Sequence, residues 1–169
     1  LQGVSTTDIS TYLVVGAFAR NQGPLTYRRT AFDYDFNTGQ VASAFAYGGT
    51  HANTLSAMIE VNELVDDKSR IVVRIMNAMT GETYHTHAHD MADASTTPNG
   101  TPYIEAPNAD VFASPIELMD GMAAASKISP LSYDNITASY DGFFVIHDPL
   151  QAITTVDPTT YVVLGVFAR

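Results

Sequence analysis

The segment LSAMIEVNELVDDKSRIVVRIM, residues 55–76, decides the fold class of this chain. In its first part, 55–64, apolar residues alternate with more polar ones, which is the period of two that a half-buried strand requires. The turn Asp66-Asp67-Lys68 then leads into a second apolar run at 70–76. The segment therefore predicts two neighbouring antiparallel strands.

The same period continues along the chain. It predicts further strands at 82–89, 111–118, 142–147 and 160–168. It also predicts a hairpin in which 31–36 and 40–47 pair across the turn Asn37-Thr38-Gly39. We expect a short helix at 119–128 and a long ordered loop at 91–110. Short strands with turn signals between them indicate an all-β fold, an antiparallel β-sandwich or barrel.

Composition excludes several classes of protein. Of the 169 residues 46% are hydrophobic and 15% are charged, so we expect one folded domain rather than a disordered chain. The formal net charge of −10 and the absence of a basic cluster argue against a nucleic-acid partner. No run of apolar residues is long enough to predict a membrane span. The chain has no cysteine, which excludes disulfides and thiolate metal sites.

The chain contains an internal repeat with a period of 149 residues. Residues 1–20, LQGVSTTDISTYLVVGAFAR, align without a gap on residues 150–169, LQAITTVDPTTYVVLGVFAR, and 11 of the 20 positions are identical. Two strands of similar composition would resemble each other by chance only within the strand itself, whereas this match also covers the polar stretch before it. The repeat indicates one period of a tandem array.

Two arrangements explain the repeat. In the first, residues 1–20 correspond to the last strand of a preceding module and residues 21–169 form the domain. In the second, the chain is a separate subunit whose N-terminal strand is donated to a neighbour. In both, the partners are copies of the chain or neighbouring repeats. The residues expected to carry this assembly are Thr11, Tyr12, Val14, Gly16, Phe18, Tyr161, Val163, Gly165 and Phe167.

Four of the five histidines fall in two expected strands. His85, His87 and His89 stand at i, i+2 and i+4, so they project from one face of a strand about 7 Å apart. His147 ends the apolar run at 143–147. Neighbouring histidines of such a row can share one metal ion, and a histidine at the end of a buried strand can complete a site formed across the sheet.

With these residues the sequence resembles the copper/zinc superoxide dismutase family, including its copper-only secreted members. The phrase YHTHAHDMAD at 84–93 is similar to the family's strand with His-x-His copper ligands, and FFVIHDPLQAI at 143–153 is similar to the strand with another copper histidine. TYVVLGVFAR at 160–169 is similar to the family's last strand. The resemblance covers roughly residues 55–169.

The resemblance implies a Greek-key β-sandwich or barrel and a copper site. The copper ligands it implies are His85, His87 and His147, with His89 and His51 as further candidates. It also implies features that this chain lacks. The loop after His89 contains no histidine, so the zinc site and the bridging histidine are missing, and we expect no zinc.

Two more departures bear on activity. The family's disulfide is absent, and Tyr161 or a neighbouring threonine stands where the family has an arginine that attracts superoxide. We therefore assign no catalytic residue and favour a non-enzymatic structural or assembly module of an extracellular filament or multidomain array, without a resident cofactor. The alternative is a copper-binding domain with superoxide dismutase or copper-storage activity.

Two sequences fit the N-glycosylation pattern. They are Asn99-Gly100-Thr101 and Asn135-Ile136-Thr137, and they support an extracellular or secreted location.

Overall fold

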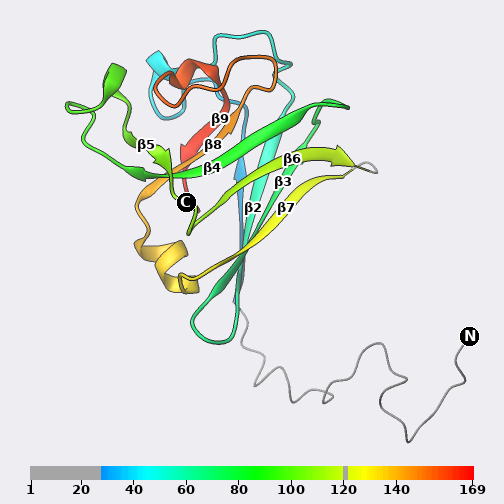
Figure 1. The fold of residues 1–169 in the computed structure, drawn as a ribbon, viewed down its shortest axis with the longest axis vertical. Helices are drawn as coiled ribbons and strands as arrows, with labels where there is room; N and C mark the ends of the chain where they lie inside the picture. Colours follow the sequence, from blue (N-terminus) through cyan, green and yellow to red (C-terminus); the bar gives the residue numbers. More distant parts are fainter. Residues whose placement is uncertain (1–27, 120–121) are drawn as a thin grey trace, which may run out of the picture.

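The computed structural model describes residues 28–119 and 122–169 and has an all-β architecture. The strands curve into a nearly closed barrel (Figure 1). They are β1 (Arg29–Tyr34), β2 (Ser56–Glu63), β3 (Ser69–Met76), β4 (Thr83–Met91), β5 (Tyr103–Pro107), β6 (Ala113–Met119), β7 (Met122–Ser129), β8 (Gly142–His147) and β9 (Tyr161–Val166). Short helical turns lie at Ser43–Phe45, Pro98–Gly100, Asn135–Ser139 and Pro158–Thr160. The all-β, antiparallel prediction is confirmed.

The order of the strands around the barrel is β1-β2-β3-β7-β6-β4-β8-β9, with β5 paired to β4. All pairs among the described strands are antiparallel. The segment that decides the fold class forms the β2–β3 hairpin, in which eight residue pairs run from Ser56↔Met76 to Glu63↔Ser69. The strands expected at 82–89, 142–147 and 160–168 are present as β4, β8 and β9.

Two local predictions are wrong. Residues 40–47 do not pair with β1, because β1 pairs with β2 instead, and the segment forms a loop with a 3₁₀ turn. Its aromatic Phe45 packs against the sheet from that loop. The helix expected at 119–128 is replaced by strand β7, which pairs with β3 from Ser69↔Ser129 to Ile75↔Ala123. In both places pairing with a distant strand outweighs local propensity.

The segment 91–110 contains more structure than a loop. It carries the 3₁₀ turn Pro98–Gly100 and strand β5, which pairs with β4 at His89↔Pro107 and Met91↔Tyr103. A register shift between His89 and Met91 interrupts this ladder. The segment thus folds back to pair with the end of β4.

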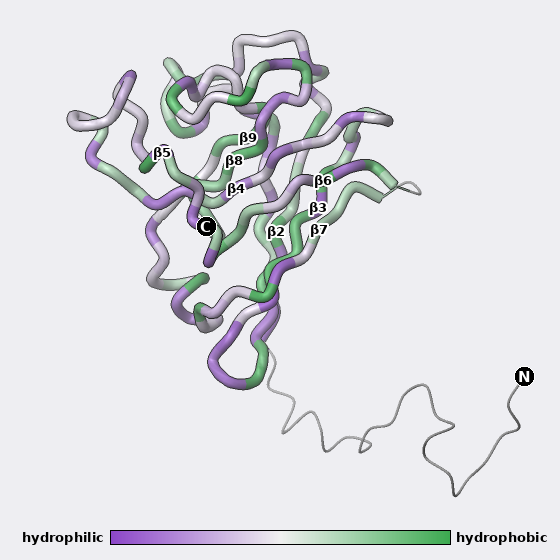
Figure 2. Tube along the Cα trace, viewed as in Figure 1, coloured by the Kyte–Doolittle hydropathy of each residue, from purple (hydrophilic) through white to green (hydrophobic). Residues whose placement is uncertain are grey.

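The barrel has an inner core and a second apolar layer outside it. The two layers meet at β8, where Phe144 and Ile146 face the inner core while Phe143 and Val145 face the outer layer. This explains why every residue of β8 is buried and why the strand is predominantly hydrophobic (Figure 2). A sheet that is covered on both faces gives a continuous apolar run instead of an alternating one.

Tyr34 closes the gap between β1 and β9, whose described residues form no ladder. Its hydroxyl donates to the Val166 carbonyl at 2.9 Å and accepts from the Ala168 N–H at 2.7 Å. Its ring packs tilted against Phe144, with 4.9 Å between ring centroids. Burial raises the pKa of the Tyr34 hydroxyl, so the phenol stays protonated as this pair of bonds requires.

We expect Tyr34→Phe to lower the free energy of unfolding by about 1–3 kcal/mol, because it leaves the buried Ala168 N–H without a partner while keeping the ring. Urea unfolding would measure the loss. A loss below about 0.5 kcal/mol would contradict the role of the Tyr34 hydroxyl.

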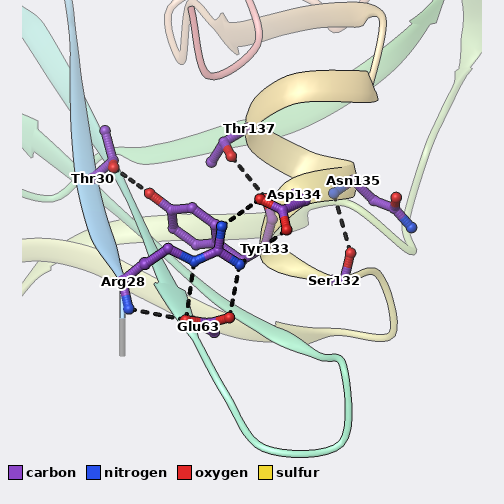
Figure 3. A network of polar contacts seen from close by, with 8 residues as sticks. All are labelled: Arg28, Thr30, Glu63, Ser132, Tyr133, Asp134, Asn135 and Thr137. Atoms are coloured by element: carbon purple, nitrogen blue, oxygen red, sulfur yellow. Dashed lines mark hydrogen bonds and ion pairs between the residues drawn. The ribbon is translucent and has the colours of Figure 1, made fainter. Parts of the chain in front are cut away.

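Arg28, just before β1, and Arg169, just after β9, both contact the helical turn at 134–140. The Arg28 guanidinium pairs with Glu63 at 2.8 Å and with Asp134, and it lies 4.4 Å from the centroid of the Tyr133 ring (Figure 3). This pairing lowers the pKa of Glu63 to about 2. At the other end of the chain, the Arg169 guanidinium donates to carbonyl oxygens of the same turn. These belong to Thr137, Ala138 and Tyr140.

Candidate metal centre

The histidines of β4 lie on the outer face of the barrel. Tyr84, Thr86 and Ala88 of this strand are buried, and Tyr84 and Ala88 belong to the inner core. The alternation of a strand therefore directs His85, His87 and His89 to the opposite face, as the sequence predicts. β8 lies beside β4, with His87 opposite Val145 and Thr86 opposite Ile146.

Three histidines converge on this face. His87, His89 and His147 each offer a ring nitrogen, and these nitrogens all lie within 4.8 Å of one another. The ring centroids are 5.8 Å apart for His87 and His89 and 5.2 Å apart for His87 and His147. We call these three residues the histidine triad.

Each member of the histidine triad has a buried ring nitrogen without a hydrogen-bond partner in the structure. These atoms are His87 Nδ1, His89 Nε2 and His147 Nε2. The tautomer of His89 is fixed, because its Nδ1 lies 2.9 Å from the Ile104 carbonyl, which can only accept. Its lone pair is therefore on Nε2. Fixing a ligand histidine through its other nitrogen in this way is typical of metal sites.

The triad is neutral at physiological pH. Burial, and after it the neighbouring histidines of the cluster, lower the pKa of His87 to about 4 and that of His147 to about 3. Burial also lowers the pKa of His89. Neutral imidazoles leave their lone pairs available to a cation, and imidazole is a ligand that suits copper and zinc.

Two tyrosines cover the triad. Tyr103 packs against His89 and Tyr161 packs against His147, with ring centroids 5.0 Å and 4.7 Å apart. The Tyr103 hydroxyl donates to the Tyr161 hydroxyl at 3.0 Å, and that group donates to the Thr154 carbonyl at 3.0 Å. Both tyrosines are fully buried, so the triad is shielded from solvent on this side.

A small pocket of about 140 Å³ reaches His85 and His147. Its walls are Thr83, His85, His147, Asp148, Pro149, Gln151 and Ile153. None of these residues is a lysine or arginine. His85 is half-buried here, and its ring centroid is 6.5 Å from that of His87. The structure therefore places His85 beside the triad at the pocket and not within the group of converging nitrogens.

His51 lies away from the triad. It is buried, its Nδ1 lies 2.9 Å from the Ala52 carbonyl, and its Nε2 lies 2.8 Å from the Tyr84 hydroxyl. Both ring nitrogens are thus occupied by protein partners, as in a structural core histidine. Of the candidate ligands, the structure brings His87 and His147 together with His89, which was one of the two further candidates.

The other predicted sites are placed as follows. Asn99 and Asn135 are both exposed. Tyr161, Val163, Gly165 and Phe167 lie in or directly after β9, and three of these four are fully buried. Thr11, Tyr12, Val14, Gly16 and Phe18 lie outside the described residues.

Sequence reasoning missed Tyr103. It lies in the segment expected to be a loop, and no motif marks it as a neighbour of His89. Only the pairing of β5 with the end of β4 brings the two together.

Comparison with protein-family models, curated proteins and solved structures found no match. In the ranges described, no helix is long and apolar enough to cross a membrane.

We expect the metal-free chain to lose stability in acid because of the triad. The folded pKa values of His87 and His147, about 4 and about 3, lie below the ordinary 6.5, so the unfolded chain binds protons first as pH falls. The part of the free energy of unfolding that depends on the neutral triad is fully present above pH 6.5 and is lost as pH falls toward 3. Allowing for partial solvent screening, urea unfolding should give a free energy about 3 kcal/mol lower at pH 4.5 than at pH 7.

Carboxylates also titrate in this range, so the comparison needs a variant. His147→Gln should show a shallower decline than the parent chain. Parallel profiles for the parent and His147→Gln would contradict the assignment.

Proposed function

We propose that this chain is a copper-binding β-barrel domain in which His87, His89 and His147 hold one copper ion. The observation that carries the proposal is the set of three buried ring nitrogens without hydrogen-bond partners, on neutral imidazoles that converge within 4.8 Å. Leaving several buried polar atoms unpaired is costly, and a shared cation would satisfy all three at once. The proposal includes a superoxide dismutase-like Greek-key fold.

The donor set is compatible with copper. Three neutral nitrogen ligands suit copper in either oxidation state, and bound copper supplies one-electron chemistry. The Ile104 carbonyl holds the His89 ring so that Nε2 faces the other histidines. Tyr103 and Tyr161 exclude water from the same side.

Copper storage or a structural copper site is favoured over superoxide dismutation. Two members of the triad are closed to solvent, with His89 0% and His147 2% exposed, and His87 is half-buried. The pocket that reaches His147 has no cationic wall that would attract an anion. Turnover needs an accessible coordination position and guidance for superoxide, whereas retention of an ion needs neither.

The test is the metal content of the full chain. After loading with copper and exhaustive dialysis, elemental mass spectrometry should find about one copper per chain. A superoxide-removal assay on the same sample should find no more activity than in buffer alone. No retained copper would overturn the proposal. Retained copper with activity that His147→Gln abolishes would instead assign the dismutase.

The internal repeat favours a second candidate function, a structural module of a filament or multidomain array. Residues 1–20 repeat the sequence of β9 and the segment leading into it, so the chain has one more copy of this sequence than a single barrel uses. A spare strand that pairs with another copy would convert edge pairing into controlled assembly. Partners would then be copies of the chain or neighbouring repeats.

Light scattering and electron microscopy would test the array. The full chain should form multimers, and a chain in which residues 1–20 are replaced by a Gly/Ser sequence of equal length should not. Multimers that persist after this replacement would overturn the role of the repeat.

We infer an extracellular location from the two glycosylation sequences, in which Asn99 and Asn135 are exposed residues. The Asn99 side-chain amide donates to the Val156 carbonyl at 3.0 Å, and a glycan there would replace this bond. Expression in a host with a secretory pathway should add glycan mass that a glycosidase removes. The doubly substituted chain, Asn99→Gln with Asn135→Gln, is the control, and an unmodified parent chain would contradict the inference.

A further inference from the structure

We propose that this chain carries two interchangeable ninth strands, residues 150–169 and residues 1–20, and that either can complete the barrel formed by residues 28–149. The docking site is the slot between β8 and β1 that β9 fills in the structure. The inference deepens the array proposal by naming the slot and its occupant, and it does not depend on the metal site.

The slot has a strict requirement at Gly165. A Cβ atom at this position would lie 2.9 Å from Cδ1 and 3.0 Å from Cε1 of the Tyr34 ring. This ring cannot easily move, because Tyr34 bonds Val166 and Ala168 and packs against Phe144. The aligned residue is Gly16, so the N-terminal segment meets the requirement.

The end of the strand imposes further requirements. Phe167 and Ala168 are buried, and the Ala168 N–H donates to Tyr34. Arg169 then donates to carbonyl groups of the 137–140 turn. All three residues recur unchanged in the N-terminal segment, as Phe18, Ala19 and Arg20.

The beginning of the strand is also matched. Asp157 ends the preceding loop, where its side chain accepts from the Thr159 N–H at 3.0 Å, and Tyr161 fills the outer layer. Their counterparts Asp8 and Tyr12 are identical. The positions that differ between Tyr161 and Ala168 exchange one aliphatic residue for another, such as Val162 for Leu13 and Leu164 for Val15.

The N-terminal segment can reach the slot of its own chain. Arg28 and Arg169 both contact the helical turn at 134–140, so the point where the strand ends lies close to the point where the barrel chain begins. If residue 20 took the place of residue 169, residues 21–27 would have to bridge this gap. Eight extended residues span at most about 28 Å, which is ample for two sides of one turn.

One slot and two fitting segments leave one segment unused in every folded chain. The unused segment can then fill the slot of a second copy. Its pairing would repeat the backbone ladder of β8 with β9, which runs from Phe143↔Val166 to His147↔Tyr161. The partner chemistry is therefore another barrel of this sequence.

The experiment uses three variants of the full chain, which are Gly165→Val, Gly16→Val and the double variant. Valine at position 165 would clash with the Tyr34 ring, so the N-terminal segment should take the slot. Hydrogen exchange read by mass spectrometry should then show protection moving from residues 161–167 to residues 12–18. The urea midpoint of each single variant should stay near that of the parent chain. The equilibrium constant for unfolding of the double variant should be about a hundredfold larger than that of the parent chain.

The proposal is overturned if Gly165→Val loses as much stability as the double variant and Gly16→Val has no effect in either background. Light scattering at several concentrations identifies the source of the strand in Gly165→Val, since a monomer shows self-completion and a concentration-dependent multimer shows exchange between copies. If protection moves to residues 12–18 and no multimers form, this inference is upheld and the array proposal is overturned. If multimers form and protection does not move, the array proposal is upheld and this inference is overturned.

Discussion

Saturating copper should raise the melting temperature of this chain by about 10 °C. A ligand at a thousandfold excess over its Kd, bound only to the folded state, adds about 4 kcal/mol to the free energy of unfolding. For a domain of this size each kcal/mol corresponds to about 2–4 °C. His147→Gln should remove the shift, because the triad would then offer two imidazoles and the copper Kd should rise by about a thousandfold or more.

Two further variants separate the triad from the ligand set that the family resemblance implies. If copper is held by the histidine triad, His89→Gln should abolish the shift and His85→Gln should retain it. If copper is held by His85, His87 and His147, the two results should be exchanged. Differential scanning calorimetry with and without copper measures both, and His51→Gln serves as the control for loss of a histidine elsewhere.

A copper shift that survives in His147→Gln, His89→Gln and His87→Gln alike would contradict the site. The unpaired ring nitrogens would then need another explanation, and the repeat would be the stronger guide to function. The same variants without metal give a second measurement, the free energy of unfolding. His87→Gln and His147→Gln remove a ring nitrogen that has no hydrogen-bond partner, whereas His89→Gln also removes the bond to the Ile104 carbonyl, so His89→Gln should lower the free energy of unfolding most.

The sequence predicts much of this fold because the pattern is strong where strands are half-buried. The alternation in 55–64 and the apolar run at 70–76 are sufficient to place β2 and β3. It fails at 119–128, where alanines favour a helix in isolation but β3 supplies a long pairing partner. It also fails at 40–47, whose apolar residues cover the sheet from a loop.

The site was predictable to the same degree. The spacing of His85, His87 and His89 establishes that they share a face, and the end of an apolar run marks His147. Which three converge was not predictable. That depends on how β8 lies against β4, on the register shift at Ile146 and His147 against β9, and on the Ile104 carbonyl that turns the His89 ring.

Phe144→Ala should lower the free energy of unfolding by about 3–5 kcal/mol, the largest loss of stability that we expect from one substitution in the barrel. Phe144 is fully buried in the inner core, where its ring contacts Tyr34 and Phe167. Removing it opens a cavity behind β8, and the strands on both sides limit how far the cavity can collapse. Urea unfolding at neutral pH without metal would measure the loss.

The same substitution tests whether stability and copper binding are separate properties of β8. Phe144 faces the inner core, whereas the histidine triad lies on the outer face. The copper affinity of the folded Phe144→Ala chain should therefore change less than tenfold. Phe143→Ala offers the matched comparison. Phe143 lies in the outer layer beside Tyr103, so this substitution should weaken copper binding more than Phe144→Ala does.

The control for the loss of stability is Ile104→Ala, at a side chain that is 48% exposed, which should lower the free energy of unfolding by less than about 0.5 kcal/mol. If Phe144→Ala proved as mild as Ile104→Ala, Phe144 would not be a principal support of the inner core.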